Sequence, residues 1–178
     1  DVLGELDRFS RVDASIQAVA VADCVQEAVA MLPSFPDTEI EIDVDPEVHK
    51  QPPVASARFV LKHVLQNLFV NAVEAVTAAG RSVAKIAVTA CPKTVDGIPY
   101  VDLQVRDNGI GIPSELMASI FVRGFSTKKN GRRGAGLHWC ATSISTLDGK
   151  IYAESGGSGQ GATFHILLRI AAQKSEIG

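Results

Sequence analysis

The sequence predicts an α+β fold, a two-layer α/β sandwich with helices packed on one face of a mixed, mostly antiparallel sheet. Two observations lead to this prediction. Helical and strand patterns follow one another without regular βαβ alternation, which argues against a doubly wound parallel sheet. The chain has 178 residues, of which 46% are hydrophobic, so it can bury one sizeable core and a single compact domain is expected.

The first half of the chain predicts two helices with a strand between them. Apolar residues recur at helical spacing from residue 16 to residue 32, until Pro33 ends the pattern. Residues 39–44 alternate between polar and apolar side chains, which predicts a strand. A long helix is expected over residues 55–79, and Gly80 supplies its end.

The second half predicts mainly strands, interrupted by one long loop. Five elements are expected: strands over residues 83–90, 98–107, 150–155 and 162–170, and a helix over residues 134–149. Asp96-Gly97 predicts a tight turn between the first two of these strands. Residues 108–133 contain four glycines and only one expected short helix, near residues 114–121. Loops of that length are commonly functional lids or disordered segments.

Composition excludes several classes of function. The net charge is −3 and no long basic run is present, so nucleic acid is not expected as a partner. No apolar stretch approaches the roughly 20 residues of a membrane span, so no membrane contact by this domain is expected. Cys24, Cys91 and Cys140 form no C-x-x-C pair and are interpreted as buried thiols of a reducing cytosol.

A carboxylate ends the strand predicted over residues 98–107. Val101, Leu103, Val105 and Asp107 share one face of that strand, because side chains alternate with a period of two. A carboxylate on an apolar face is costly to bury unless it accepts hydrogen bonds from the protein or from a ligand. Glycines follow at positions 109 and 111, which allow a sharp turn and let a flat group lie against the backbone. A strand closed by an Asx turn is the alternative.

Polar side chains form a stripe on the predicted helix over residues 55–79. Asn67, Asn71 and Glu74 are spaced at i, i+4 and i+7, although asparagine is a mediocre helix former. The stripe is either a solvated helix face or a set of oxygens that point at a cation and its phosphates. Neutral oxygen ligands suit Mg²⁺, which commonly shares its coordination with substrate phosphates.

A glycine-rich, charged loop precedes the helix predicted over residues 134–149. Hydroxyls and cations at Ser126, Thr127, Lys128 and Lys129 lead into glycines near the helix start, which is a favourable setting for an anion. The alternative is a surface loop whose charges keep it soluble. Neither the P-loop pattern nor G-x-G-x-x-G is present, so two common nucleotide folds are excluded.

Taken together and in order, these segments resemble the ATP-binding catalytic domain of sensor histidine kinases, which has the Bergerat fold. The same fold occurs in type II topoisomerases, mismatch-repair ATPases and heat-shock chaperones. The matching segments are Asn67-Leu-Phe-Val-Asn71-Ala-Val-Glu-Ala for the N box, Asp107-Asn-Gly109-Ile-Gly111-Ile-Pro for the G1 box, Ile120-Phe121-Val-Arg-Gly-Phe125-Ser-Thr-Lys for the F box, Gly134-Ala-Gly136-Leu137 for the G2 box, and Gly161-Ala-Thr163-Phe164 for the last glycine motif.

The resemblance implies a role for each matching residue. Asp107 would accept a hydrogen bond from the adenine amino group, Thr163 would help through a water molecule, and Asn71 would ligate Mg²⁺. Implied catalytic residues are Asn67, Asn71 and Lys128. Implied nucleotide contacts, beneath a mobile ATP lid, come from Asn71, Glu74, Asp107, Gly109, Gly111, Phe125, Thr127, Lys128, Lys129, Gly134, Gly136, Leu137 and Thr163.

One position separates the relatives that hydrolyse ATP from the kinases. ATP-hydrolysing members usually carry a glutamate one helical turn before the magnesium asparagine, where this chain has Asn67. An amide has no useful basicity, so a kinase is favoured. A free ATPase, a serine kinase of the anti-sigma type and a docking module without catalysis stay open as alternatives.

The chain also departs from the family pattern. Arg132 occupies the usual first glycine of the G2 box, as if one residue were inserted, and no histidine lies in a phosphoacceptor setting. The acceptor is therefore expected in an upstream dimerisation domain, with residues 1–13 as its tail or linker and residues 14–178 as the catalytic domain. The expected partners are that dimerisation domain and a response-regulator receiver domain. The expected location is the cytoplasm, including as the cytoplasmic part of a membrane-bound sensor.

Overall fold

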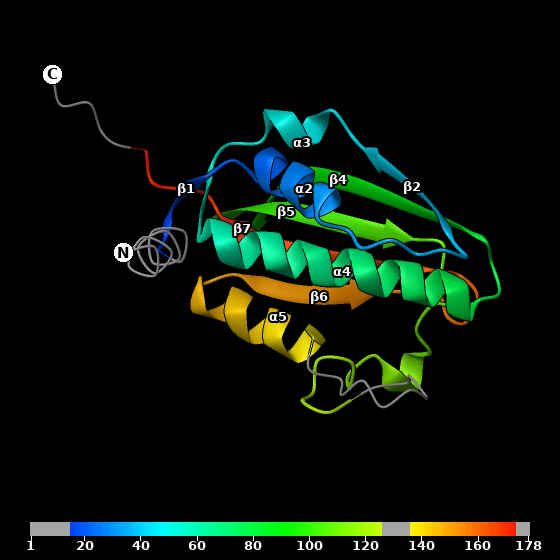
Figure 1. Cartoon of the computed structure of the whole chain (residues 1–178). Coiled ribbons are helices and arrows are strands. Elements are labelled where there is room, and N and C mark those ends of the chain that lie inside the picture. Colours follow the sequence, from blue (N-terminus) through cyan, green and yellow to red (C-terminus); the bar gives the residue numbers. More distant parts are fainter. Residues whose placement is uncertain (1–14, 126–135, 174–178) are drawn as a thin grey trace, which may run out of the picture.

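A five-stranded sheet and a layer of helices on one of its faces make up the computed structural model, which describes residues 15–125 and 136–173 (Figure 1). The strands are β2 (Glu39–Val44), β4 (Val83–Val95), β5 (Ile98–Asp107), β6 (Lys150–Glu154) and β7 (Ala162–Arg169), in the spatial order β2-β4-β5-β7-β6. β2 runs parallel to β4, whereas the other three neighbouring pairs are antiparallel. The predicted mixed, mostly antiparallel sandwich is confirmed.

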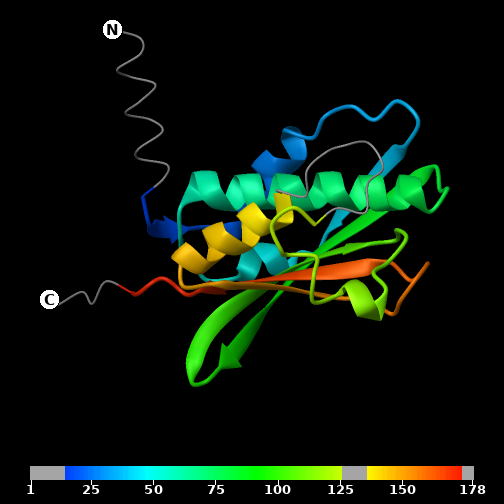
Figure 2. The ribbon, with the colours of Figure 1, turned by 90° about the horizontal axis from the view of Figure 1, so that it is seen from below.

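Three helices form the second layer. They are α2 (Val21–Ala30), α4 (Arg58–Ala78) and α5 (Gly136–Thr146), and Figure 2 shows α4 and α5 lying side by side across the sheet. The remaining elements are small: helix α3 (Glu47–Lys50), the 3₁₀ helix η1 (Ser114–Leu116), and a two-stranded antiparallel sheet of β1 (Gln17–Val19) and β3 (Val54–Ser56). No helix among these described residues is long and apolar enough to cross a membrane.

The core lies between α4 and the sheet. The apolar stripe predicted for this helix is buried, with Leu61 and Leu65 fully inaccessible. On β5, Leu103 and Val105 are buried in the same cluster. Burying one such side chain contributes about 1.5–3 kcal/mol, so this helix is held in place mainly by its apolar face. Because its apolar face is packed in this way, α4 also holds the polar stripe on its neighbouring face in a fixed position.

The turn between β4 and β5 follows the prediction closely. Asp96 and Gly97 both have positive φ values, 51° and 77°. A two-residue turn with that geometry matches the right-handed twist of the flanking strands. The hairpin fixes the register that pairs Val88 with Val105 and brings Asp107 opposite Ile86.

Some local predictions were wrong. Residues 17–19 form strand β1 rather than the start of a helix, because they pair with β3, a strand far along the chain that was not predicted. Helix α3 was also missed. Cys24 and Cys140 are buried as predicted, but Cys91 is exposed, since it lies on the outer side of the sheet edge near the hairpin. The expectation for residues 1–13 lies outside the described residues.

Candidate functional site

The buried carboxylate of Asp107 is the centre of the site. Its side chain is 5% exposed, and its Oδ1 atom accepts the N–H groups of Gly109 at 2.8 Å and Ala162 at 3.3 Å. Burial raises the pKa of the Asp107 carboxyl above its ordinary value, and the two backbone N–H groups oppose that shift. Among the described residues nothing donates to Oδ2, so this oxygen is left to accept from an outside donor.

A glycine turn next to Asp107 forms a close-fitting cradle. A Cβ atom at Gly109 would lie 2.7 Å from the Cβ of Ala75 and 2.8 Å from the Asp107 carboxylate. Ile110 then donates its N–H to the Ala75 carbonyl at 2.9 Å. Gly111 has φ +75°, a conformation that other residues rarely adopt. The turn is therefore pressed against α4, and only glycine fits at its two key positions.

The loop between β6 and β7 closes the cradle from the other side. Gly161 donates its N–H to the Gly109 carbonyl at 3.1 Å, and Gly159 donates to the Ile110 carbonyl at 2.5 Å. A Cβ atom at Gly161 would lie 2.1 Å from the carbonyl oxygen of Asp107. The close approach of these backbones packs the glycine turn and the β6–β7 loop tightly around the carboxylate.

The start of α5 lies against the polar stripe of α4. A Cβ atom at Gly136 would come within 3.0 Å of Asn67 Oδ1, while Asn67 Nδ2 donates to the His63 carbonyl at 3.0 Å. Asn71 and Glu74 are half-buried on the same stripe. Free N–H groups at a helix start attract anions, so this meeting of two helices is suited to phosphate groups.

The described residues contain no cluster of three or more histidine, cysteine, aspartate or glutamate side chains that would hold a metal by itself. A cation at this site would depend on neutral amide oxygens, such as that of Asn71, and on oxygens of the ligand. That donor set suits Mg²⁺ rather than a transition metal.

Two phenylalanines attach the loop before α5 to the body of the domain. Phe121 packs edge-on against Phe164 of β7, with ring centroids 6.3 Å apart, and Phe125 is partly buried against the core. His138 Nδ1 lies 3.1 Å from the Phe121 carbonyl oxygen, which links this loop to α5. Leu137 also packs against the core. Five residues named from the sequence lie outside the described residues: Thr127, Lys128, Lys129, Arg132 and Gly134.

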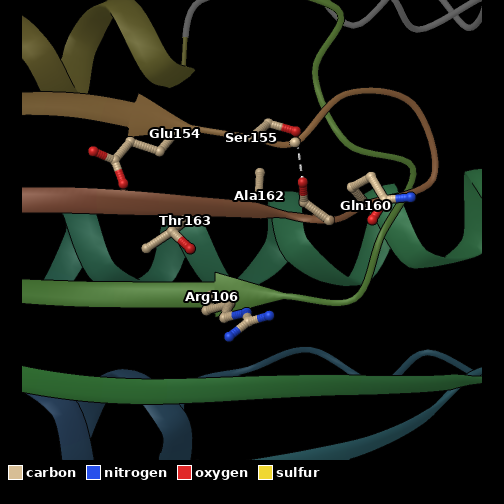
Figure 3. Close-up of a pocket in the computed structure, with 8 residues that line it drawn as sticks. Arg106, Glu154, Ser155, Gln160, Ala162 and Thr163 are labelled. Carbon is tan, nitrogen blue, oxygen red and sulfur yellow. Dashed lines mark hydrogen bonds between the residues drawn. The ribbon is translucent and has the colours of Figure 1, made fainter.

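The expectation that Thr163 assists Asp107 was wrong in its geometry. In the sheet Thr163 pairs with Arg106, whereas Asp107 pairs with Ala162. Since adjacent residues of a strand point to opposite faces, Thr163 faces away from the helices and Ala162 lies beside the carboxylate. Figure 3 shows Thr163 near Arg106 and Glu154, in front of the strands, where these residues line a polar pocket of about 310 Å³.

The same outer face carries a buried, hydrogen-bonded pair that the sequence did not predict. His165 Nδ1 lies 3.0 Å from Asp102 Oδ2, and the two residues are 6% and 2% exposed. The ring of Tyr152 stacks on that of His165 at 4.4 Å, and Gln104 Nε2 donates to Asp102 Oδ2 at 3.0 Å. This packing gives His165 a structural role in the sheet.

A family model matches residues 57–172, described as the histidine kinase-, DNA gyrase B- and HSP90-like ATPase. The matched region contains the carboxylate, the glycine turn, the polar stripe of α4 and the helix start of α5.

Several curated relatives are sensor kinases. The chain is 37% identical over 130 residues to the sensor protein CitS of Halalkalibacterium halodurans, which covers 72% of the chain but 23% of CitS. It is 32% identical over 181 residues to the signal transduction histidine-protein kinase AtoS of Escherichia coli, covering 98% of the chain and 28% of AtoS. The chain thus spans about a quarter of the length of these relatives.

Solved structures share the fold. The catalytic domain of the histidine kinase ThkA superposes with a TM-score of 0.67 at 26% identity, covering 88% of this chain and 96% of that domain. Full-length ShkA in complex with AMPPNP gives a TM-score of 0.69 at 25% identity, covering 89% of this chain and 32% of ShkA. With the family model matching well over half of its residues, the chain belongs to the family of histidine kinase-, DNA gyrase B- and HSP90-like ATPases.

Proposed function

We propose that this chain is the catalytic domain of a sensor histidine kinase. It binds Mg-ATP and donates the γ-phosphate to a histidine on a dimerisation domain outside the chain, and a response-regulator receiver domain then takes the phosphoryl group. The observation that carries the proposal is the Asp107 carboxylate, which has one oxygen held by two backbone N–H groups and the other left for a donor. The names of the relatives support the same activity.

The geometry around Asp107 supports a role for this residue in recognising adenine. The adenine amino group donates to Oδ2, while the flat base lies against the turn at Gly109 and Gly111. The Asp107 residue is only 5% exposed, so few water molecules compete for its carboxylate. A hydrogen bond from the adenine amino group therefore contributes more binding free energy there than at the surface. The related ShkA structure is a complex with the nucleotide analogue AMPPNP, which supports nucleotide binding by this chain.

The phosphates lie at the meeting of α4 and α5. The start of α5 at Gly136, the positive end of that helix, faces the triphosphate, and the amides of Asn67 and Asn71 lie on the adjoining helix. Asn71, together with the phosphates, would hold Mg²⁺, which would supply charge neutralisation for the transfer. Lys128, Lys129, Thr127 and Gly134 are proposed to hold the phosphate tail from the adjoining loop.

The reaction is phosphoryl transfer to an outside nucleophile. A histidine ring nitrogen attacks the γ-phosphorus, the bond to the β–γ bridging oxygen breaks, and ADP leaves. The chain positions the donor and provides charge stabilisation. Because Asn67 offers an amide where an ATPase needs a base, water is not activated and the phosphate is kept for the acceptor.

The acceptor domain is proposed to precede this chain in the same protein, since the curated relatives are about four times longer than the matched segment. Residues 1–13 would then be a tail of the dimerisation helix or a linker, and residues 14–178 the catalytic unit. We also propose a cytoplasmic location, including as the cytoplasmic part of a membrane-bound sensor, since the proposed response regulator must reach the phosphorylated histidine there.

Two measurements test the proposal. Isothermal titration of the chain with AMPPNP and Mg²⁺ should show binding, and γ-labelled ATP should label a histidine of a dimerisation domain supplied in trans. Asn71→Ala should abolish that labelling, whereas Gln66→Ala on another side of the same helix should leave it unchanged. Absence of nucleotide binding would refute the proposal, steady ATP turnover by the chain alone would favour an ATPase, and labelling of a protein serine would favour the anti-sigma type.

A further inference from the structure

Ser155 lies immediately after β6 and makes hydrogen bonds with two loops of the site. Its Oγ atom accepts the N–H of Ile112 at 3.0 Å and that of Gly157 at 3.2 Å, and it donates to the carbonyl of Gly161 at 2.7 Å. A hydroxyl has one donor and two acceptor positions, so all three are used. No sequence motif of the site includes this residue.

The Gly161 carbonyl is the important partner, because it belongs to the peptide unit whose N–H comes from Ala162. That N–H donates to Asp107 Oδ1 at 3.3 Å. A peptide unit is planar, so holding its carbonyl also fixes the direction of its N–H. Ser155 is therefore connected to the Asp107 carboxylate through one rigid peptide plane.

The second partner is the turn that carries the two glycines of the cradle. Ile112 directly follows Gly111, and a Cβ atom at Gly111 would lie 2.1 Å from the Gly157 carbonyl oxygen and 3.1 Å from Ser155 Oγ. The two loops thus meet without space for a side chain, and Ser155 links them by accepting the N–H of Ile112. Figure 3 shows its other bond, to the Gly161 carbonyl within the β6–β7 loop.

We propose that Ser155 is a positioning residue for base recognition. It aligns the Gly161–Ala162 peptide with Asp107 and holds the glycine turn against the β6–β7 loop, so that Oδ2 points to where the adenine amino group binds. The proposal deepens the proposed function and rests on it. Ser155 does not touch the phosphates, and its removal affects the base rather than the transfer step.

The test compares ATP with inosine triphosphate, which has a carbonyl in place of the adenine amino group. Ser155→Ala should weaken ATP binding about tenfold, the effect of roughly one well-formed hydrogen bond, and should change inosine triphosphate binding less than about twofold. The preference for ATP therefore falls. A general loss of structure would instead weaken both nucleotides together, so the ratio separates positioning from stability.

Matched variants complete the experiment, with all affinities measured by isothermal titration in the presence of Mg²⁺. Ser158→Ala, an exposed serine in the same loop, should keep the wild-type ratio, and Ser155→Thr, which retains the hydroxyl, should restore most of the preference. If Ser155→Ala does not fold, Ser155→Cys carries the same comparison, since a thiol of similar size is a weak donor. An unchanged ratio in a folded variant overturns the inference, whereas a wild-type chain that binds neither nucleotide overturns the proposed function.

Discussion

Replacing Asp107 with asparagine should separate nucleotide binding from stability. The carboxylate is 5% exposed, and burial raises its pKa, so its ionised form is destabilised in the nucleotide-free fold. An amide can retain its oxygen at the Oδ1 position, where it still accepts from Gly109 and Ala162. The amide nitrogen then takes the Oδ2 position. Since this nitrogen and the adenine amino group are both hydrogen-bond donors, the bond between side chain and base is lost.

The expected loss of affinity comes from one hydrogen bond to a charged group. Such a bond is worth about 1.5–3 kcal/mol, so Asp107→Asn should weaken ATP binding roughly 10- to 150-fold. Isothermal titration with AMPPNP measures this change directly. Normal affinity in the variant would refute the role of Asp107 in recognising the base.

Stability should change in the opposite direction. A raised carboxyl pKa stabilises the fold below the ordinary pKa of the group, and this contribution is lost as pH rises through the raised pKa. At neutral pH the ionised side chain therefore costs free energy, and Asp107→Asn should raise the free energy of unfolding. As the pH falls and Asp107 becomes protonated, the difference in the free energy of unfolding between the wild type and the asparagine variant should shrink.

Asp107→Ala is the matched comparison. It removes the acceptor and leaves the N–H groups of Gly109 and Ala162 unpaired, at a cost of about 1–3 kcal/mol each where they are buried. Urea unfolding should thus order the three proteins as asparagine variant, wild type and alanine variant, from most to least stable. If both variants were destabilised equally, the reasoning from burial would be wrong.

Three further predictions concern the rest of the chain. Gly109→Ala should destabilise the fold by about 1–3 kcal/mol in urea unfolding and prevent nucleotide binding, because its Cβ would lie 2.7 Å from that of Ala75. A variant with wild-type stability would show that the turn is not packed closely against α4. His165→Leu leaves the buried Asp102 without one of its hydrogen-bond partners and should lower the free energy of unfolding by about 1–3 kcal/mol. Nucleotide affinity should not change, since the pair lies on the outer face of the sheet. A thiol reagent at neutral pH should modify only Cys91 of the folded protein, because this cysteine is exposed. Burial raises the pKa of the Cys24 thiol to about 11 and that of the Cys140 thiol to about 12, so both stay unreactive. Modification of either buried thiol in the folded state would refute this prediction.

Local patterns predicted most of the secondary structure correctly. The long apolar stripe of α4 and the alternating strand β5 were recognised because their side chains repeat at the period of the element itself. The turn at Asp96-Gly97 was recognised because its backbone geometry restricts the residue types. Strand β1 was missed, since three residues become a strand only when a distant partner, β3, lies beside them.

Some residues of the candidate site could be predicted from the sequence and others could not, because the latter also depend on partners that are distant in the chain. Asp107 and Gly109 could be selected from sequence, because a carboxylate at the end of an apolar strand face and a glycine after it are unusual in themselves. Thr163 was assigned to the wrong side, since the pairing register decides which of two neighbouring residues faces the carboxylate. Ser155 was not considered, because a serine in a glycine-rich loop carries no signal until its three backbone partners are placed around it.

By itself the sequence determined the longer elements, the two-layer class and the polar residues that lie at the ends and along the faces of those elements. Those features depend on periodicity and backbone preference within short segments, and so they are readable one segment at a time. Only the tertiary structure decided that Ala162 rather than Thr163 faces Asp107, that Asn67 meets the start of α5, and that Asp102 and His165 form a buried pair. Each of these depends on strand register or on the packing of one element against another, which pairs residues that are far apart in the chain.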